Sequence, residues 1–180
     1  MLLVILLALS GYFAWESYQS LEREEQQIAE AYDAFQYTIN TQKNRNIRLN
    51  AKMKRNLTDL FVKDSIYTPA VEQFTKYVDD LEIVLDSQMD VELYDHEKLI
   101  ASIEQFCDQI SLIINEKSKL DSFRQNLLFR ISASDDPQDQ LANLLESKIA
   151  LYGFQNHLLS TLEDRIIAEV PEYETIWSGY

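Results

Sequence analysis

Helix-breaking residues are scarce in this chain of 180 residues. Glycine and proline occur at three positions each, namely Gly11, Gly153, Gly179, Pro69, Pro137 and Pro171. Because turns and sheet connections draw heavily on these two residues, their scarcity predicts long helices with few connections. The expected fold class is all-α.

The first fifteen residues carry no charge, and the sequence turns polar at Glu16. No Lys or Arg precedes this apolar run and no small-residue cleavage site follows it, which disfavours a secretory signal. A soluble core helix is a further alternative. Tyr12, Trp15 and Tyr18 lie at the polar boundary, as in an aromatic belt. Fifteen helical residues span about 22 Å, short of a ~30 Å hydrocarbon core. We therefore expect a transmembrane helix over residues 1–18 that lacks its first residues.

A narrow apolar stripe follows without an intervening helix breaker. Its members are spaced by 7, 4, 3 and 4 residues and are Leu21, Ile28, Tyr32, Phe35 and Ile39. This spacing is typical of a coiled coil or of a helix in a bundle. The sequence predicts that the membrane helix continues directly into a soluble helix.

Further amphipathic segments fill the rest of the chain, separated by predicted breaks at residues 41–46, 65–69, 87–94 and 132–137. Thr68 and Asp95 are expected helix caps. The last helix, about residues 137–170, is the expected centre against which shorter helices pack, and Pro171 ends it. We expect an up-and-down helical bundle over residues 19–170, followed at 171–180 by a tail or the start of another domain.

The net charge of -14 is distributed unevenly, with -5 on residues 1–40, +6 on 41–63 and -15 on 64–180. The acidic bulk should repel nucleic acid, so no nucleic-acid partner is expected. The basic stretch over residues 43–63 is either a solvated helix face or a contact surface for anionic lipid or an acidic partner.

Side chains suited to catalysis are few. Cys107 is the single cysteine and lies on an apolar helical face, and the only histidines are His96 and His157. His96 is expected to be solvated and His157 to be structural. No Glu-x-x-His pair, calcium loop, phosphate-binding loop or nucleophile elbow occurs. We expect a non-enzymatic protein with no cofactor and no metal.

The chain resembles the GldM/PorM family, the periplasmic stalk subunits of the gliding-motility and type IX secretion motor. Met1, Leu3, Val4, Leu9 and Glu16 match the family's membrane-helix spacing. "KYVDDLEIVL" with "DVELYDHEKL", "KLDSFRQNLL" and "FQNHLLSTLEDRIIAEV" are similar to later helices of the family. The family's usual Asn is replaced by Tyr12, and its basic N-terminal segment is absent.

The resemblance implies a homodimeric stalk in the bacterial inner membrane, single-pass, with most of the chain in the periplasm. Its membrane helix would lie within a ring of the multi-span GldL/PorL-like partner and would transmit proton-motive-force-driven rotation to the outer-membrane secretion machinery. Residues expected to contact this ring or lipid are Leu3, Ile5, Leu6, Leu7, Leu9, Tyr12, Trp15 and Glu16. The stripe from Leu21 to Ile39 would form the dimer or stalk contact.

One alternative of another class is the four-helix ligand-binding domain of a chemoreceptor or sensor kinase. The sensor hypothesis predicts a second membrane helix soon after residue 180, whereas the motor hypothesis predicts β-rich domains there. A generic membrane-anchored adaptor is the third alternative.

Overall fold

The computed structural model describes residues 2–59, 67–113, 116–132 and 136–169. The side chains of residues 2–14, 56–59, 67, 68, 91 and 169 are outside this description. The chain divides into two units, Met1–Tyr37 and Thr38–Tyr180. All regular structure in the described residues is helical. The expected all-α class is therefore confirmed in its helical content.

The described part of the first unit is helical throughout and belongs to helix α1 (Leu2–Asp59). Among the residues that the structure describes, no helix is both long enough and apolar enough to cross a membrane. The predictions of a transmembrane helix over residues 1–18 and of a single-pass inner-membrane protein are therefore wrong. The physical reason is that polar and charged residues begin at Glu16 and continue along the same helix, which lowers its mean hydropathy.

Most of the residues expected to contact a membrane partner cannot be placed by their side chains. Leu3, Ile5, Leu6, Leu7, Leu9 and Tyr12 lie outside the described side chains. Trp15 and Glu16 are described, and both are exposed on α1.

Within the second unit, residues 38–59 of α1 form one uninterrupted helical segment. The break predicted at residues 41–46 is wrong, because those polar residues sit inside the helix. Asn46 is buried rather than placed in a turn. Polar residues in a helix need not indicate its end when a neighbouring helix covers them.

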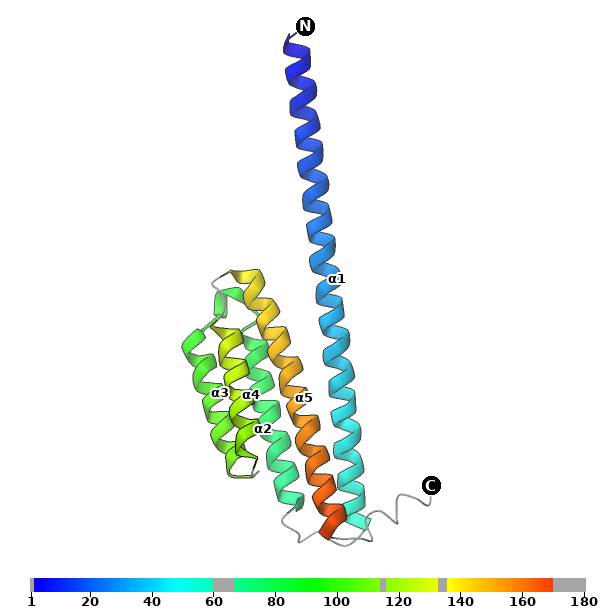
Figure 1. The fold of residues 1–180 in the computed structure, drawn as a ribbon, viewed down its shortest axis with the longest axis vertical. Coiled ribbons are helices and arrows are strands. Elements are labelled where there is room, and N and C mark those ends of the chain that lie inside the picture. The colour runs from blue at the N-terminus through cyan, green and yellow to red at the C-terminus, as the bar shows by residue number, and fades with distance from the viewer. Residues whose placement is uncertain (1, 60–66, 114–115, 133–135, 170–180) are drawn as a thin grey trace. The chain divides into compact units, whose positions relative to one another are not determined.

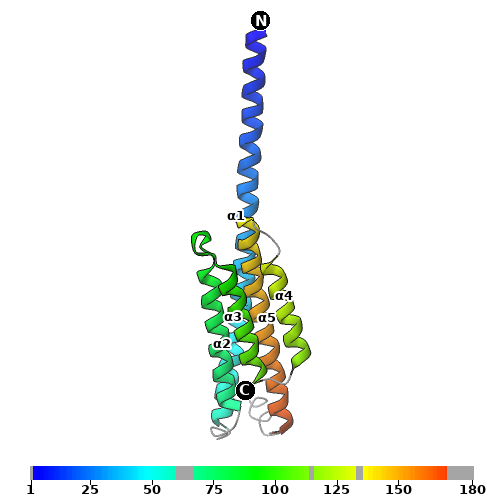
Figure 2. The same ribbon diagram turned by 90° about the vertical axis from the view of Figure 1, so that its left-hand side faces the viewer.

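The remaining helices form an up-and-down bundle, as predicted. They are α2 (Tyr67–Ser87), α3 (His96–Ser111), α4 (Lys117–Ile131) and α5 (Pro137–Glu169), with a short 3-10 helix η2 (Val91–Leu93) between α2 and α3. Each packs on the next, and α5 returns to α2, which closes a four-helix ring. Figures 1 and 2 show these four helices side by side. Residues 170–180 lie outside the described residues.

Helix boundaries follow the expected signals in part. The Asp95 side chain accepts a hydrogen bond from the backbone N–H of Lys98 at 3.0 Å, so the predicted cap of α3 is confirmed. Helix α2 begins at Tyr67, one residue before the predicted cap Thr68. The Asp90 side chain accepts a hydrogen bond from the backbone N–H of Glu92 and so caps η2. This cap was not predicted.

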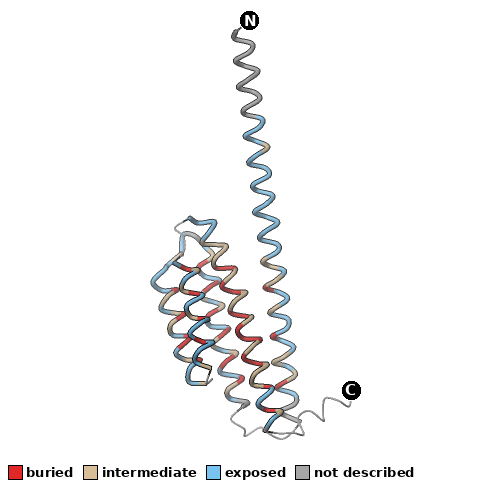
Figure 3. Tube along the Cα trace, in the orientation of Figure 1, coloured by how far each residue is buried: buried red, intermediate tan, exposed pale blue. Residues whose placement is uncertain are grey.

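Helix α5 is the centre of the bundle, as expected. Buried residues recur along this 33-residue helix (Figure 3), because α2 and α4 cover one part and residues 42–52 of α1 cover another. On the ring side, Phe123 of α4 stacks on Phe154 at 4.3 Å between ring centroids and tilts against Phe106 of α3 at 5.8 Å. This aromatic contact joins three helices of the core.

Candidate interaction surface

The predicted stripe of α1, hereafter the α1 stripe (Leu21, Ile28, Tyr32, Phe35 and Ile39), is exposed over its first part. Leu21 is 59% exposed, Ile28 48% and Tyr32 42%, whereas Phe35 is half-buried. Tyr18 extends the same heptad spacing by three residues and is also exposed. Large apolar side chains that recur at heptad spacing on an open helix face indicate a surface for another helix.

Ile39 does not belong to this open surface. It lies in the second unit and is 3% exposed, so it is part of the interior there. Ile39 is therefore covered within this chain, unlike the first three members of the stripe. Its spacing alone could not reveal this, because a stripe that packs within the chain and a stripe that packs on another chain have the same period.

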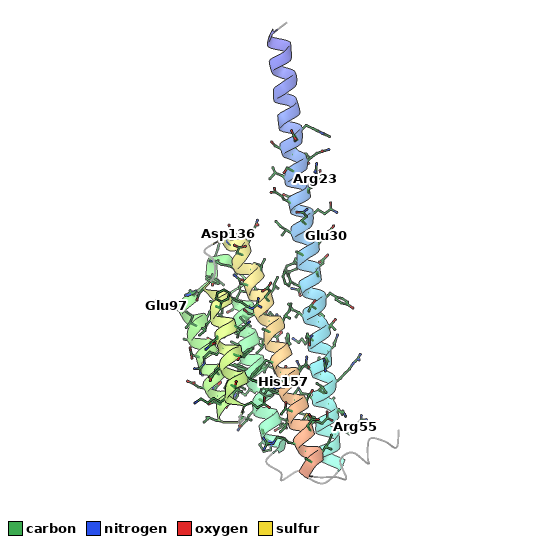
Figure 4. All side chains as sticks on the ribbon, in the orientation of Figure 1. Arg23, Glu30, Arg55, Glu97, Asp136 and His157 are labelled. Carbon is green, nitrogen blue, oxygen red and sulfur yellow. The ribbon has the colours of Figure 1, made fainter. Side chains whose placement is uncertain are left out.

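The opposite face of the same helix is occupied by polar side chains that pair with one another. Arg23 donates a hydrogen bond from its guanidinium to the Gln19 side chain at 3.4 Å, and Gln26 donates to Glu30 at 3.0 Å. Figure 4 labels Arg23 and Glu30 on this helix. These pairs of residues four apart stabilise an exposed helix locally. The face of α1 that carries Arg23 and Glu30 is therefore polar, with side chains that bond to one another, whereas the face that carries the α1 stripe is apolar and exposed.

Acidic residues surround the α1 stripe. Glu25 falls at a stripe position between Leu21 and Ile28, and Glu22 and Glu24 flank it. All three carry negative charge beside the single cation Arg23 of residues 1–37. A partner helix would face these charges together with the apolar side chains.

In the second unit, helix α1 meets α5 through amide side chains. Asn46 donates from Nδ2 to the carbonyl oxygen of Tyr152 at 3.3 Å, and Asn156 donates to the Gln42 side chain at 2.7 Å. Among the described residues, the side-chain oxygens of Asn46, Asn50 and Asn156 are buried without a hydrogen-bond partner. We call these residues the polar seam (Gln42, Asn46, Asn50, Tyr152 and Asn156). The seam is not predictable from the sequence pattern, because polar residues in a helix are ordinarily exposed.

A charged network lies beside this seam. Lys148 of α5 is 2.5 Å from Asp86 and 3.7 Å from Glu82, both of α2, and Lys43 of α1 is 2.8 Å from Glu82. Burial raises the pKa of Glu82, but the hydrogen bond from Lys43 and the nearby Lys148 charge outweigh it, so this pKa lies below its usual value. Burial and the Glu82 carboxylate raise the pKa of Tyr152 well above its ordinary range.

The basic stretch of α1 is divided between the interior contacts and the surface. Lys43 pairs with Glu82, and Lys52 pairs with Glu163 of α5 at 2.7 Å. Arg45, Arg48 and Arg55 are exposed. The positive charge therefore serves in part to attach α1 to α2 and α5, an outcome that falls outside both interpretations drawn from the sequence.

The residues with potential chemistry occupy separate places. Cys107 is fully buried in the core, as expected, and burial raises the pKa of its thiol. His96 is exposed, as expected. His157, labelled in Figure 4, is half-exposed. Its Nε2 lies 2.5 Å from Lys119 Nζ and 3.3 Å from a Glu116 carboxylate oxygen. His157 thus takes part in a polar contact between α5 and the start of α4. No group of three possible metal ligands occurs within the described part of the chain.

Among the residues that the structure describes, the most distinctive surface of this helical protein is the exposed part of the α1 stripe. Comparison of the chain with protein-family models, with curated proteins and with solved structures gives no significant match. Function must therefore be argued from the surfaces themselves.

Proposed function

We propose that this chain is a non-enzymatic assembly module, a stalk-type subunit that pairs with a second copy of itself through the α1 stripe. One observation supports this most directly: Leu21, Ile28 and Tyr32 are exposed at heptad spacing on a helix whose opposite face is polar and self-paired. An isolated amphipathic helix gains stability by burying such a stripe against another helix.

The second unit supports the proposal through its construction. Its interior joins α1 to α2 and α5 by ion pairs and amide contacts, and α2 to α5 form a closed ring. Closely packed helices of this kind resist deformation. This property suits a subunit that holds a partner or transmits motion to it, rather than one that catalyses a reaction.

The machine in which such a module acts is proposed from the resemblance described above. A GldM/PorM-like subunit would serve as a stalk in the motor that powers type IX secretion or gliding motility, with the downstream secretion machinery as its partner. The support is the similarity of residues 76–85, 90–99, 119–128 and 154–170, together with the helical bundle that α2 to α5 form.

Sedimentation equilibrium of the chain and two single variants tests the self-pairing. The wild-type chain should show a concentration-dependent dimer. Ile28→Lys, which places a charge in the stripe, should shift the equilibrium to monomer, whereas Glu30→Lys on the opposite face should not. Far-ultraviolet circular dichroism would verify that both variants keep the bundle. A wild-type chain that stays monomeric at high micromolar concentration would refute the proposal.

A further inference from the structure

A cavity of about 280 Å³ opens in the second unit, at the end where α2 begins and α5 ends. Its apolar wall comes from two helices, α2 and α5, and from the segment that follows α3, and the residues of this wall are Ala70, Phe74, Ile113, Leu158 and Leu162. Phe74 and Leu158 are each only 2% exposed, so the wall is continuous with the core. A cavity of ~150 Å³ lined by such side chains accommodates benzene, so this one has room for a larger apolar group.

Polar side chains line the rest of the cavity. Glu116, Thr161 and Arg165 contribute to it. Glu116 is engaged by His157 and Lys119, whose nitrogens lie 3.3 and 3.6 Å from its carboxylate. Burial raises the pKa of Glu116, but these two neighbours outweigh it and hold the pKa below its usual value. Its negative charge is therefore already matched within the bundle.

Arg165 is the exception among the polar groups of this cavity. Within the described residues its guanidinium forms no ion pair and no hydrogen bond, and its side chain is exposed. Thr161 directs its hydroxyl to the backbone carbonyl of His157 at 3.1 Å. A guanidinium offers paired donors that match a carboxylate, whereas neither Glu116 nor the apolar wall favours a second anionic group.

We infer that this cavity binds a small apolar monocarboxylate, with its hydrocarbon body against Phe74, Leu158 and Leu162 and its carboxylate on Arg165. A few convergent polar groups at the edge of an apolar cavity are the usual design of a small-molecule site. This site is independent of the self-pairing of α1, because none of its residues belongs to the α1 stripe.

Isothermal titration calorimetry of the whole chain at pH 7 tests the inference with three probes of one shape: 3-phenylpropanoate, 3-phenylpropan-1-ol and 3-phenylpropylammonium. The carboxylate should bind measurably, and the alcohol and the ammonium ion should bind about tenfold more weakly or less, since they lack the charge-assisted contact.

Three variants locate the binding. Arg165→Gln should weaken 3-phenylpropanoate binding about tenfold and leave the alcohol unchanged. Arg48→Gln, a matched change at an exposed arginine of α1, should alter neither. Ala70→Phe should fill the cavity and abolish binding of all three probes. Three results would each overturn the inference: no binding of the carboxylate, an equal effect of the two arginine variants, or binding that survives Ala70→Phe. None of these results bears on dimer formation.

Discussion

Asn46 of α1 donates a hydrogen bond to the backbone carbonyl oxygen of Tyr152 in α5, while its own side-chain oxygen is buried without a partner among the described residues. The Asn46 side chain is only 3% exposed. The carbonyl that it contacts lies inside a helix and keeps its intrahelical bond in any case. The polar seam thus leaves a desolvated acceptor unmatched, and such an acceptor costs about 1–3 kcal/mol when it is not satisfied.

Asn46→Leu should therefore stabilise the chain, because it removes the unmatched acceptor and adds apolar contact of similar volume. We expect a gain of about 1 kcal/mol in the free energy of unfolding, measured by urea denaturation. Asn44→Leu is the matched control on an exposed position of the same helix and should change stability by less than about 0.5 kcal/mol. A destabilised Asn46→Leu would indicate that the seam's amides are satisfied in solution, for example by buried water.

Two carboxylates of α2, three residues apart, should respond to pH in opposite ways. Burial and the charge of Glu82 raise the pKa of Asp79 above its usual 3.8, so its ionisation opposes folding at neutral pH. The pKa of Glu82 is lowered from its usual 4.5 by Lys43 and Lys148 in spite of burial, so its ionisation favours folding. The contribution of Glu82 is present above pH 4.5 and is lost as pH falls through its folded-state pKa.

Asp79→Asn should therefore raise the melting temperature at pH 7, and Glu82→Gln should lower it. Both differences should shrink as pH falls from 7 toward 3, because the carboxyl groups become progressively protonated. Melting curves between pH 3 and 7 measure this, with exposed Glu72→Gln as the control. The prediction fails if the two variants shift the melting temperature in the same direction at pH 7.

Gly153 lies inside α5, where its backbone freedom destabilises a helix. A Cβ built at this position meets nothing within 4 Å. Gly153→Ala should thus stabilise the chain by about 0.5–1 kcal/mol, because alanine restricts the unfolded chain without a clash in the folded one. The reciprocal control, Ala101→Gly at an exposed position of α3, should cost a similar amount. The midpoints of urea denaturation measure both changes in stability. A Gly153→Ala chain less stable than the wild type would mean that α5 requires the absence of a side chain at this position.

Particular elements show how far the sequence alone could predict the structure. The spacing of Leu99, Ile103, Phe106 and Ile110 identifies α3 because one face of that helix is buried and the other exposed. Asp95 marks its start because a side-chain cap is a local signal. Such features depend only on neighbouring residues.

The rest depended on contacts between distant residues. Asn46 was assigned to a break and Lys43 to a surface, since nothing local shows that Tyr152 and Glu82, about 100 and 40 residues away, cover them. The same limit applies to the cavity, whose lining residues come from α2, α5 and the segment between α3 and α4. Periodicity identifies an apolar face, but only packing decides what covers it.

Glu25 provides the last prediction, because it occupies a stripe position of α1 between Leu21 and Ile28. If two copies pair in parallel along the stripe, their Glu25 side chains meet, and like charges at such a position oppose pairing. Glu25→Leu should lower the dimer dissociation constant about tenfold, which corresponds to about 1.4 kcal/mol. Glu30→Leu, on the face paired with Gln26, should leave it unchanged. Sedimentation equilibrium compares the three chains, and a dimer that Glu25→Leu weakens would exclude the stripe as the contact.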